Sequence, residues 1–189
     1  MTGGGAGGVG SGLGVVAVAA LCAFAGCGGG TLSPSAGTCS AAVPAGQACN
    51  ALTAAGPGIT PTCASGSLPV GEGGTIVDGT YVMTRLTYYG TDCSTTPVSE
   101  TIQIAGGCIQ VASSGPVSLT ESATYAVAGN VLSLTRTCFN AGAAVSTSTQ
   151  DVSQTFTATA TGFTIFNQQP TTDGGVAGDV AVFTRPLAK

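Results

Sequence analysis

Eight short runs rich in Thr, Val, Ile, Tyr and Phe follow one another from residue 79 onward, separated by glycine-containing turns. Runs of this length and composition are typical of β-strands, and their regular spacing predicts an antiparallel meander. Glycines at Gly106-Gly107, Gly129-Asn130 and Gly162 indicate tight hairpins. No segment of the mature chain predicts a helix. The expected strands are residues 80–89, 100–105, 108–113, 118–128, 131–138, 154–161, 163–167 and 180–185.

This meander is predicted to close on itself. An open sheet leaves two edges exposed, and charged residues, which commonly protect such edges, make up only 6% of the chain. A closed up-and-down barrel has no edges, whereas a sandwich would require longer crossovers than these hairpins supply. The sequence therefore predicts an all-β fold, with an eight-stranded antiparallel up-and-down barrel at residues 75–189.

Composition removes several classes of function. The chain has no His, so catalytic sets of the Ser-His-Asp and Cys-His kinds and His-ligated metal sites are excluded. A net charge of -4 has the wrong sign for binding nucleic acid through its phosphates. No cofactor, metal or catalytic residue is predicted. The protein is not expected to be an enzyme, although a hydrolase whose carboxylate pair the sequence does not reveal is an alternative.

The N-terminal part predicts export. The apolar run at residues 13–26 is too short to cross a bilayer as a helix but suits the core of a signal peptide, here residues 1–26. The stretch Phe24-Ala25-Gly26-Cys27 resembles the lipobox of bacterial lipoproteins. That resemblance implies that Cys27 carries the lipid, palmitate included, and anchors the protein in the cell envelope. Because Gly28 replaces the Asp that typically retains such proteins at the inner membrane, the outer membrane is expected. The alternative is an ordinary secretory signal with a plain thiol at Cys27.

Residues 27–74 are expected to form a lipidated N-terminus and a spacer. Gly, Pro, Ser, Ala and Thr dominate this segment, Glu72 is its only charge, and neither a helical nor a strand period persists. The sequence thus divides into a signal peptide, a spacer and a barrel domain.

Six of the eight cysteines remain once Cys22 and Cys27 are set aside, and an exported chain with six cysteines predicts three disulfides. The meander places Cys93 and Cys138 at one end of the barrel and Cys108 at the other. The predicted pairs are Cys93–Cys138, Cys49–Cys63 and Cys39–Cys108; Cys63–Cys108 with Cys39–Cys49 is an alternative.

The barrel region resembles a lipocalin-like domain over roughly its last 110 residues. Gly79-Thr80-Tyr81 is similar to the G-x-W motif that opens such barrels, and Arg185 stands where many of them place an arginine across that aromatic ring. Residues 123–135, ATYAVAGNVLSLT, look like the central hairpin of small members. The resemblance implies an interior cavity for a small apolar molecule.

Two arginines bear on what such a cavity would bind. Strand alternation places Tyr81 and Arg85 on one face, and Leu132, Leu134 and Arg136 on one face of another strand. If both faces point inward, Arg85 and Arg136 form an anion site, for instance for a fatty-acid carboxylate, beside Tyr81. The alternative is an internal ion pair with Glu100 or Glu121. The predicted function is a membrane-tethered binding barrel for a small apolar or acidic ligand, with a structural or surface-interaction lipoprotein as the alternative; protein partners are not predicted.

Overall fold

The computed structural model describes Cys39 and residues 48–90, 93–142, 144–146, 151–170 and 176–186. The predicted signal peptide and Cys27 lie outside these residues. The described residues form ten strands and no helix. None of them belongs to a helix long and apolar enough to span a membrane. The strands are β1 (Thr62–Ala64), β2 (Gly79–Tyr89), β3 (Ser99–Ala105), β4 (Cys108–Ser114), β5 (Leu119–Ala128), β6 (Val131–Ala141), β7 (Ala144–Ser146), β8 (Asp151–Ala158), β9 (Gly162–Pro170) and β10 (Val176–Thr184).

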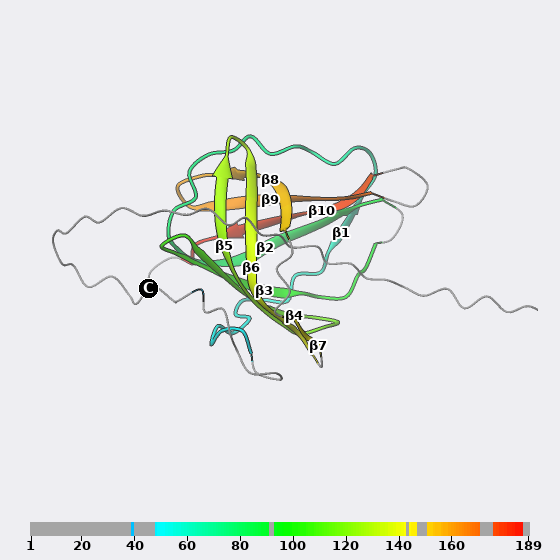
Figure 1. Ribbon diagram of the computed structural model, residues 1–189. Helices are drawn as coiled ribbons and strands as arrows, with labels where there is room; N and C mark the ends of the chain where they lie inside the picture. The colour runs from blue at the N-terminus through cyan, green and yellow to red at the C-terminus, as the bar shows by residue number, and fades with distance from the viewer. Residues whose placement is uncertain are drawn as a thin grey trace, which may run out of the picture.

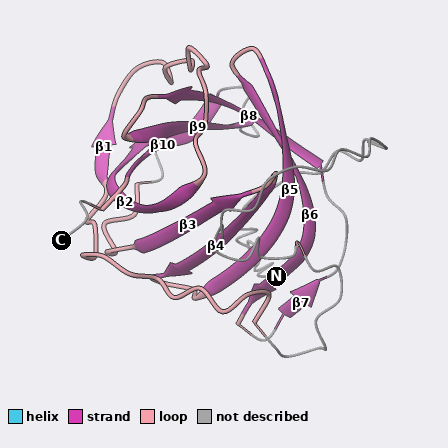
Figure 2. Ribbon diagram, turned by 90° about the vertical axis from the view of Figure 1, so that its left-hand side faces the viewer, coloured by secondary structure: helices cyan, strands magenta, loops and turns pink. Residues whose placement is uncertain are grey.

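Eight of these strands close into a barrel (Figure 1). The antiparallel order runs β2-β3-β4-β5-β6-β8-β9-β10, and β10 returns to pair with β2. In Figure 2 the strands surround a common centre, with β3 and β4 on the side opposite β8. Each barrel strand therefore lies next to its neighbours in the chain, and the predicted eight-stranded up-and-down barrel is confirmed.

The eight predicted runs are all strands, with shifted ends. β8 begins at Asp151, three residues earlier than predicted, while β2 to β6 begin within one residue of the prediction. Gly162, predicted to be a turn residue, is the first residue of β9, paired with Thr184, and the carbonyl of Phe183 occupies the space that a side chain would take there. The hairpin turn falls instead at residues 159–161. The short strands β1 and β7 were not predicted.

Aromatic side chains fill one half of the barrel. Phe163 packs edge-on against Tyr81 at 4.9 Å and stacks on Phe183 at 5.1 Å. The guanidinium of Arg185 lies over the Tyr81 ring at 5.2 Å and donates to its hydroxyl at 3.1 Å, as the resemblance implied. We call this end, where β2 begins, the basal end, and the opposite end, where β2 finishes, the distal end. The core also contains Met83, Leu86, Ile102, Ile104, Ile109, Ala123, Leu132, Leu134, Phe156 and Ala181.

Two β-bulges change which side chains point inward. In β2, Arg85 pairs with Val182 and Met83 with Phe183, so Thr84 is left over. In β6, Thr137 is left over in the same way. Each bulge threonine donates its hydroxyl to a carbonyl of the neighbouring strand, Thr84 to Val182 at 3.2 Å and Thr137 to Ser122 at 3.0 Å. Because a bulge reverses the alternation, side chains beyond it face the opposite way from a regular strand.

The predicted spacer lies against the barrel from residue 48 onward. We call residues 48–76 the belt. The Asn50 amide donates to the carbonyls of Val111 and Glu121, at 3.2 and 2.6 Å. The backbone N–H of Ala55 donates to the Thr101 hydroxyl at 2.7 Å. The belt thus crosses the outer face of β3, β4 and β5.

Further along, the belt covers two sheet edges. β2 pairs with β3 only as far as Val82, and β1 runs parallel to the next part of that edge, with Cys63 opposite Tyr88. Residues 71–73 extend along β8 where β6 no longer pairs with it: Gly73 donates to the Phe156 carbonyl at 2.7 Å. Gly71 packs directly on the Phe156 backbone, where a Cβ would clash. The belt therefore protects edges that charges do not protect in this chain.

All six predicted cysteines form disulfides, but two of the three predicted pairs are wrong. The bonds are Cys39–Cys108, as predicted, Cys49–Cys138 and Cys63–Cys93. Cys93 and Cys138 cannot meet because β2 and β6 are four strands apart in a ring of eight and lie on opposite walls. Cys49 and Cys63 do not pair locally because the belt carries each to a different part of the barrel surface. Every bond therefore joins the belt or its N-terminal extension to the barrel.

Candidate functional site

A groove of about 490 Å³ lies between the belt and the outer face of the barrel wall. Its floor contains Phe166 and Val180, which face outward yet are only 8% and 7% exposed. They are buried because belt residues 68–72 pass over this part of β9 and β10, with Leu68 against Gly178. The lining comprises Pro69, Val70, Glu72, Arg85, Thr87, Tyr89, Thr157, Thr164, Phe166 and Val180.

Arg85 is the cation of this groove. The bulge at Thr84 turns it outward, whereas regular alternation with Tyr81 and Met83 would have turned it inward. Among the described residues, no carboxylate lies within 4 Å of its guanidinium. The groove therefore combines the guanidinium of Arg85, the carboxylate of Glu72, the hydroxyls of Thr87, Thr157 and Thr164, and an apolar floor. Such a lining suits an amphipathic anion.

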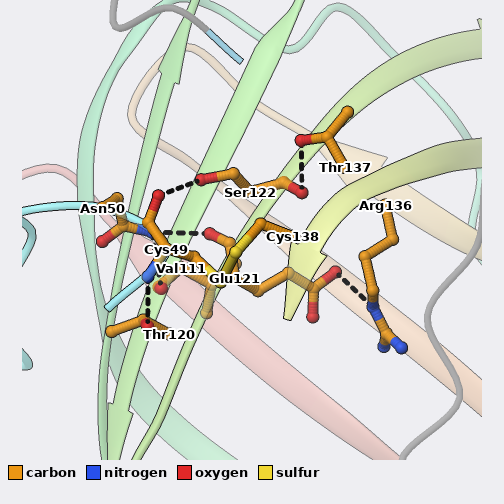
Figure 3. Close-up of a disulfide and its surroundings, with 9 residues drawn as sticks. All are labelled: Cys49, Asn50, Val111, Thr120, Glu121, Ser122, Arg136, Thr137 and Cys138. Atoms are coloured by element: carbon orange, nitrogen blue, oxygen red, sulfur yellow. Dashed lines mark hydrogen bonds and ion pairs between the residues drawn. A yellow bond between two sulfur atoms is a disulfide. The ribbon is translucent and has the colours of Figure 1, made fainter. Parts of the chain in front are cut away.

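Arg136 occupies a different environment, inside the distal half of the barrel. Its Nε lies 3.4 Å from Glu121 Oε1, and its guanidinium stacks over the Phe139 ring at 4.1 Å. Arg136 and Glu121 are 4% and 3% exposed. Figure 3 shows this ion pair beside the Cys49–Cys138 bond, whose sulfur atoms lie on the outer side of the wall because the Thr137 bulge turns Cys138 away from Arg136. Burial raises the pKa of Glu121 to about 7, and Arg136 partly opposes that rise.

Two more buried carboxyl groups lie in the same interior, Glu100 near Glu121 and Asp179 near Glu100. Burial, with Asp179 as the second cause, raises the pKa of Glu100 to about 7, although a hydrogen bond from Ser113 favours its ionised form. Burial also raises the pKa of Asp179 to about 6, against a hydrogen bond of 3.3 Å from Asn167. Tyr88 stands opposite Asp179, and its own pKa is raised by burial and by both carboxyls. The distal interior is thus an acidic cluster in which protonated carboxyls are favoured.

The predicted anion site does not form inside the barrel. Arg85 and Arg136 lie on opposite faces of the wall, so they cannot grip one carboxylate. Tyr81 belongs to the basal core, 2% exposed, and its hydroxyl donates to the Val77 carbonyl. The alternative of an internal ion pair is confirmed for Arg136 with Glu121. Cys27, the predicted lipid attachment residue, lies outside the described residues.

Sequence reasoning missed the groove and the acidic cluster. The groove depends on where the belt crosses the wall, and no local pattern encodes that course. The cluster was partly visible, because Glu100 alternates with Ile102 and Ile104 and therefore shares their inward face. Within the described part of the chain, no group of three His, Cys, Asp or Glu side chains is arranged to hold a metal ion.

Comparison with known proteins identifies no relative of this chain. No protein family, curated protein or solved structure matches the chain. The function must therefore be inferred from the groove, the interior and the sequence of the N-terminal segment.

Proposed function

We propose that this protein is an exported, lipid-anchored binding protein of the cell envelope, located at the outer membrane. Its barrel holds a small amphipathic acid in the groove beneath the belt. The observation that carries the proposal is Arg85, a guanidinium without an ion-pair partner among the described residues, beside the buried floor of Phe166 and Val180. The groove volume of about 490 Å³ suits a small ligand. The lipocalin-like resemblance supports a binding role, although the proposed site lies on the outer face of the barrel and not in its interior.

The expected contacts follow from the lining. A carboxylate head group would pair with Arg85 and accept hydrogen bonds from Thr87 or Thr164, while an alkyl chain would lie on Phe166 and Val180 under the edge of Val70. Charge-assisted hydrogen bonds contribute about 1.5–3 kcal/mol each, so the head group should determine most of the selectivity.

Arg85→Gln is expected to weaken octanoate binding by about tenfold and octan-1-ol binding by less than twofold, because only the carboxylate uses the guanidinium charge. Isothermal titration of the exported chain carrying Cys27→Ala, without reducing agent, measures both affinities. Arg85→Lys is the matched control and should retain most of the octanoate preference, since it keeps the charge. Equal losses for acid and alcohol, or an absence of octanoate binding to the parent protein, would show that the groove is not an acid site.

Cys27→Ala is expected to move the protein from the membrane fraction to the soluble fraction of the envelope, because it removes the proposed acylated residue. Two or three acyl chains bury dozens of methylenes at about 0.8 kcal/mol each, so the parent protein should not wash off in high salt. Fractionation and the intact mass of the mature chain measure anchoring and acylation. A Cys27→Ala protein that is processed normally and stays membrane-bound would contradict the lipobox interpretation.

A structural or surface-interaction lipoprotein is the second candidate. The packing of Phe156, Phe163 and Phe183 in the barrel interior favours it, because a filled barrel needs no guest to be stable. Native mass spectrometry of protein purified without delipidation separates the two candidates: a binding protein retains a guest in stoichiometric amount, and a structural one does not.

A further inference from the structure

We infer that the protein stands on the membrane with the basal end of its barrel facing the bilayer, so that the distal end points away. This inference rests on the lipid anchor proposed above. The feature that carries it is the Cys39–Cys108 disulfide, which fastens the chain nearest the anchor to one end of the barrel.

The position of Cys108 defines that end. Cys108 is the first residue of β4 and pairs with Ala105 across the basal hairpin turn. Gly106, in that turn, donates its N–H to the Asp78 carboxylate at 2.9 Å, and Asp78 immediately precedes β2. Cys39 is therefore held against β4 and β5, with its Sγ 3.2 Å from the Ala123 carbonyl, toward the same end as the start of β2 and the Tyr81–Arg185 contact.

The chain between Cys27 and the Cys39–Cys108 bond is short, and its average span is less than the height of the barrel. Cys27 and Cys39 are 12 positions apart. A chain of that length reaches at most about 40 Å when fully extended, and coils of that length span about 20 Å on average. β2, with 11 residues at about 3.3 Å each and the usual tilt of a barrel strand, gives a barrel height of roughly 25–30 Å. Turning the distal end toward the membrane would require the tether to span the whole barrel height, which exceeds the average span of about 20 Å for a coil of this length.

The chemistry of the basal end is compatible with a bilayer surface. The guanidinium of Arg185 donates to the Tyr81 hydroxyl and to the Asp78 carbonyl, and the Asp78 carboxylate accepts from Gly106, so both charges are engaged within the protein. Val77, next to Asp78, exposes 41% of its surface. Because the charges of Arg185 and Asp78 are already satisfied, they add little cost when this end approaches a membrane. The exposed Glu72 lies beside the same end, next to Gly73, which packs on the β5–β6 turn.

Single-tryptophan variants test this orientation, because the chain contains no Trp. Val77 at the basal end and Val117 in the distal β4–β5 loop are both exposed, at 41% and 53%. The full acylated protein carrying Val77→Trp or Val117→Trp is reconstituted in phosphatidylcholine vesicles with and without brominated phosphatidylcholine. We expect bromine to quench the fluorescence at position 77 at least twofold more than at position 117. Equal quenching, or stronger quenching at position 117, would overturn the orientation.

Two controls keep the anchor and the orientation separate. Flotation with the vesicles tests the anchor: a protein that fails to float overturns both the anchor and the orientation, whereas a floating protein with equal quenching overturns the orientation alone. When Cys39 and Cys108 are both replaced by Ser, the first disulfide that fastens the chain to the barrel is Cys49–Cys138, and Cys49 is 22 positions from Cys27. The difference in quenching between positions 77 and 117 should then shrink, and an unchanged difference would show that the Cys39–Cys108 bond does not set the orientation.

Discussion

Arg136→Met is expected to lower the free energy of unfolding by about 3–5 kcal/mol at pH 8, because it leaves the Glu121 carboxylate buried without its counter-ion. The variant also loses the contact between the guanidinium and the Phe139 ring. The cost should be smaller at pH 5, where Glu121 takes up a proton and no buried charge remains. Urea denaturation at the two pH values measures both effects.

The matched control for this prediction is the double variant Arg136→Met with Glu121→Gln. Replacing both members of a buried ion pair removes the uncompensated charge, so the second substitution should restore at least half of the lost stability at pH 8. A single variant within 1 kcal/mol of the parent, or a second substitution that destabilises further, would mean that the pair contributes little in the folded state.

Stability is expected to fall as the pH rises from about 4.5 to about 7, by roughly 2–3 kcal/mol from Glu100 alone. The folded protein holds the Glu100 proton up to about pH 7, whereas the unfolded chain releases it near the ordinary value of 4.5. In this window the folded state binds more protons than the unfolded state. The contribution of Glu100 to the free energy of unfolding is therefore complete below pH 4.5 and lost above pH 7. Asp179, with its pKa raised to about 6, adds in the same direction. Arg136 and Glu121 face the same interior and belong to the same titration.

Glu100→Gln should therefore stabilise the protein at pH 8 by about 1–3 kcal/mol and flatten its stability profile between pH 5 and pH 8. Asp151→Asn, at an exposed carboxylate, is the control and should leave both quantities unchanged. A Glu100→Gln protein that is less stable than the parent at pH 8, with an unchanged pH slope, would show that the carboxyl is not held protonated by its surroundings.

The barrel was predictable because its signals are local. Each strand carries its own run of β-forming residues, and the hairpin glycines fix the order in which neighbours pair, so the ring follows from the sequence. The two bulges could not be predicted. Thr84 and Thr137 are ordinary strand residues, and their hydroxyls reach the carbonyls of neighbouring strands only once those strands are paired. The outward position of Arg85 and of Cys138 depends on these bulges.

The course of the belt was hidden for a different reason. Its composition of Gly, Pro, Ser and Ala resembles that of a spacer, because small residues pack closely against a wall without showing any period. Asn50, Ala55 and Gly73 bind the barrel mainly through backbone and amide groups, which leave no hydrophobic pattern. The candidate groove lies between this belt and the wall, and so its existence could not be foreseen, although Arg85 had been selected as a candidate ligand-binding residue.

The placement of the disulfides has a consequence for how the chain matures. Cys39, Cys49 and Cys63 all precede Cys93, Cys108 and Cys138, and every native bond joins one cysteine of the first group to one of the second. Because the polypeptide emerges with its N-terminus first, the thiols of Cys39, Cys49 and Cys63 are present before those of the later strands. Until then, these three thiols can pair only with one another and not with their native partners. Bonds formed in order of emergence are therefore non-native, and oxidation must be followed by thiol exchange on the seconds-to-hours timescale of such reactions. If the thiols oxidise as they emerge, correct folding therefore requires disulfide isomerisation as well as disulfide formation.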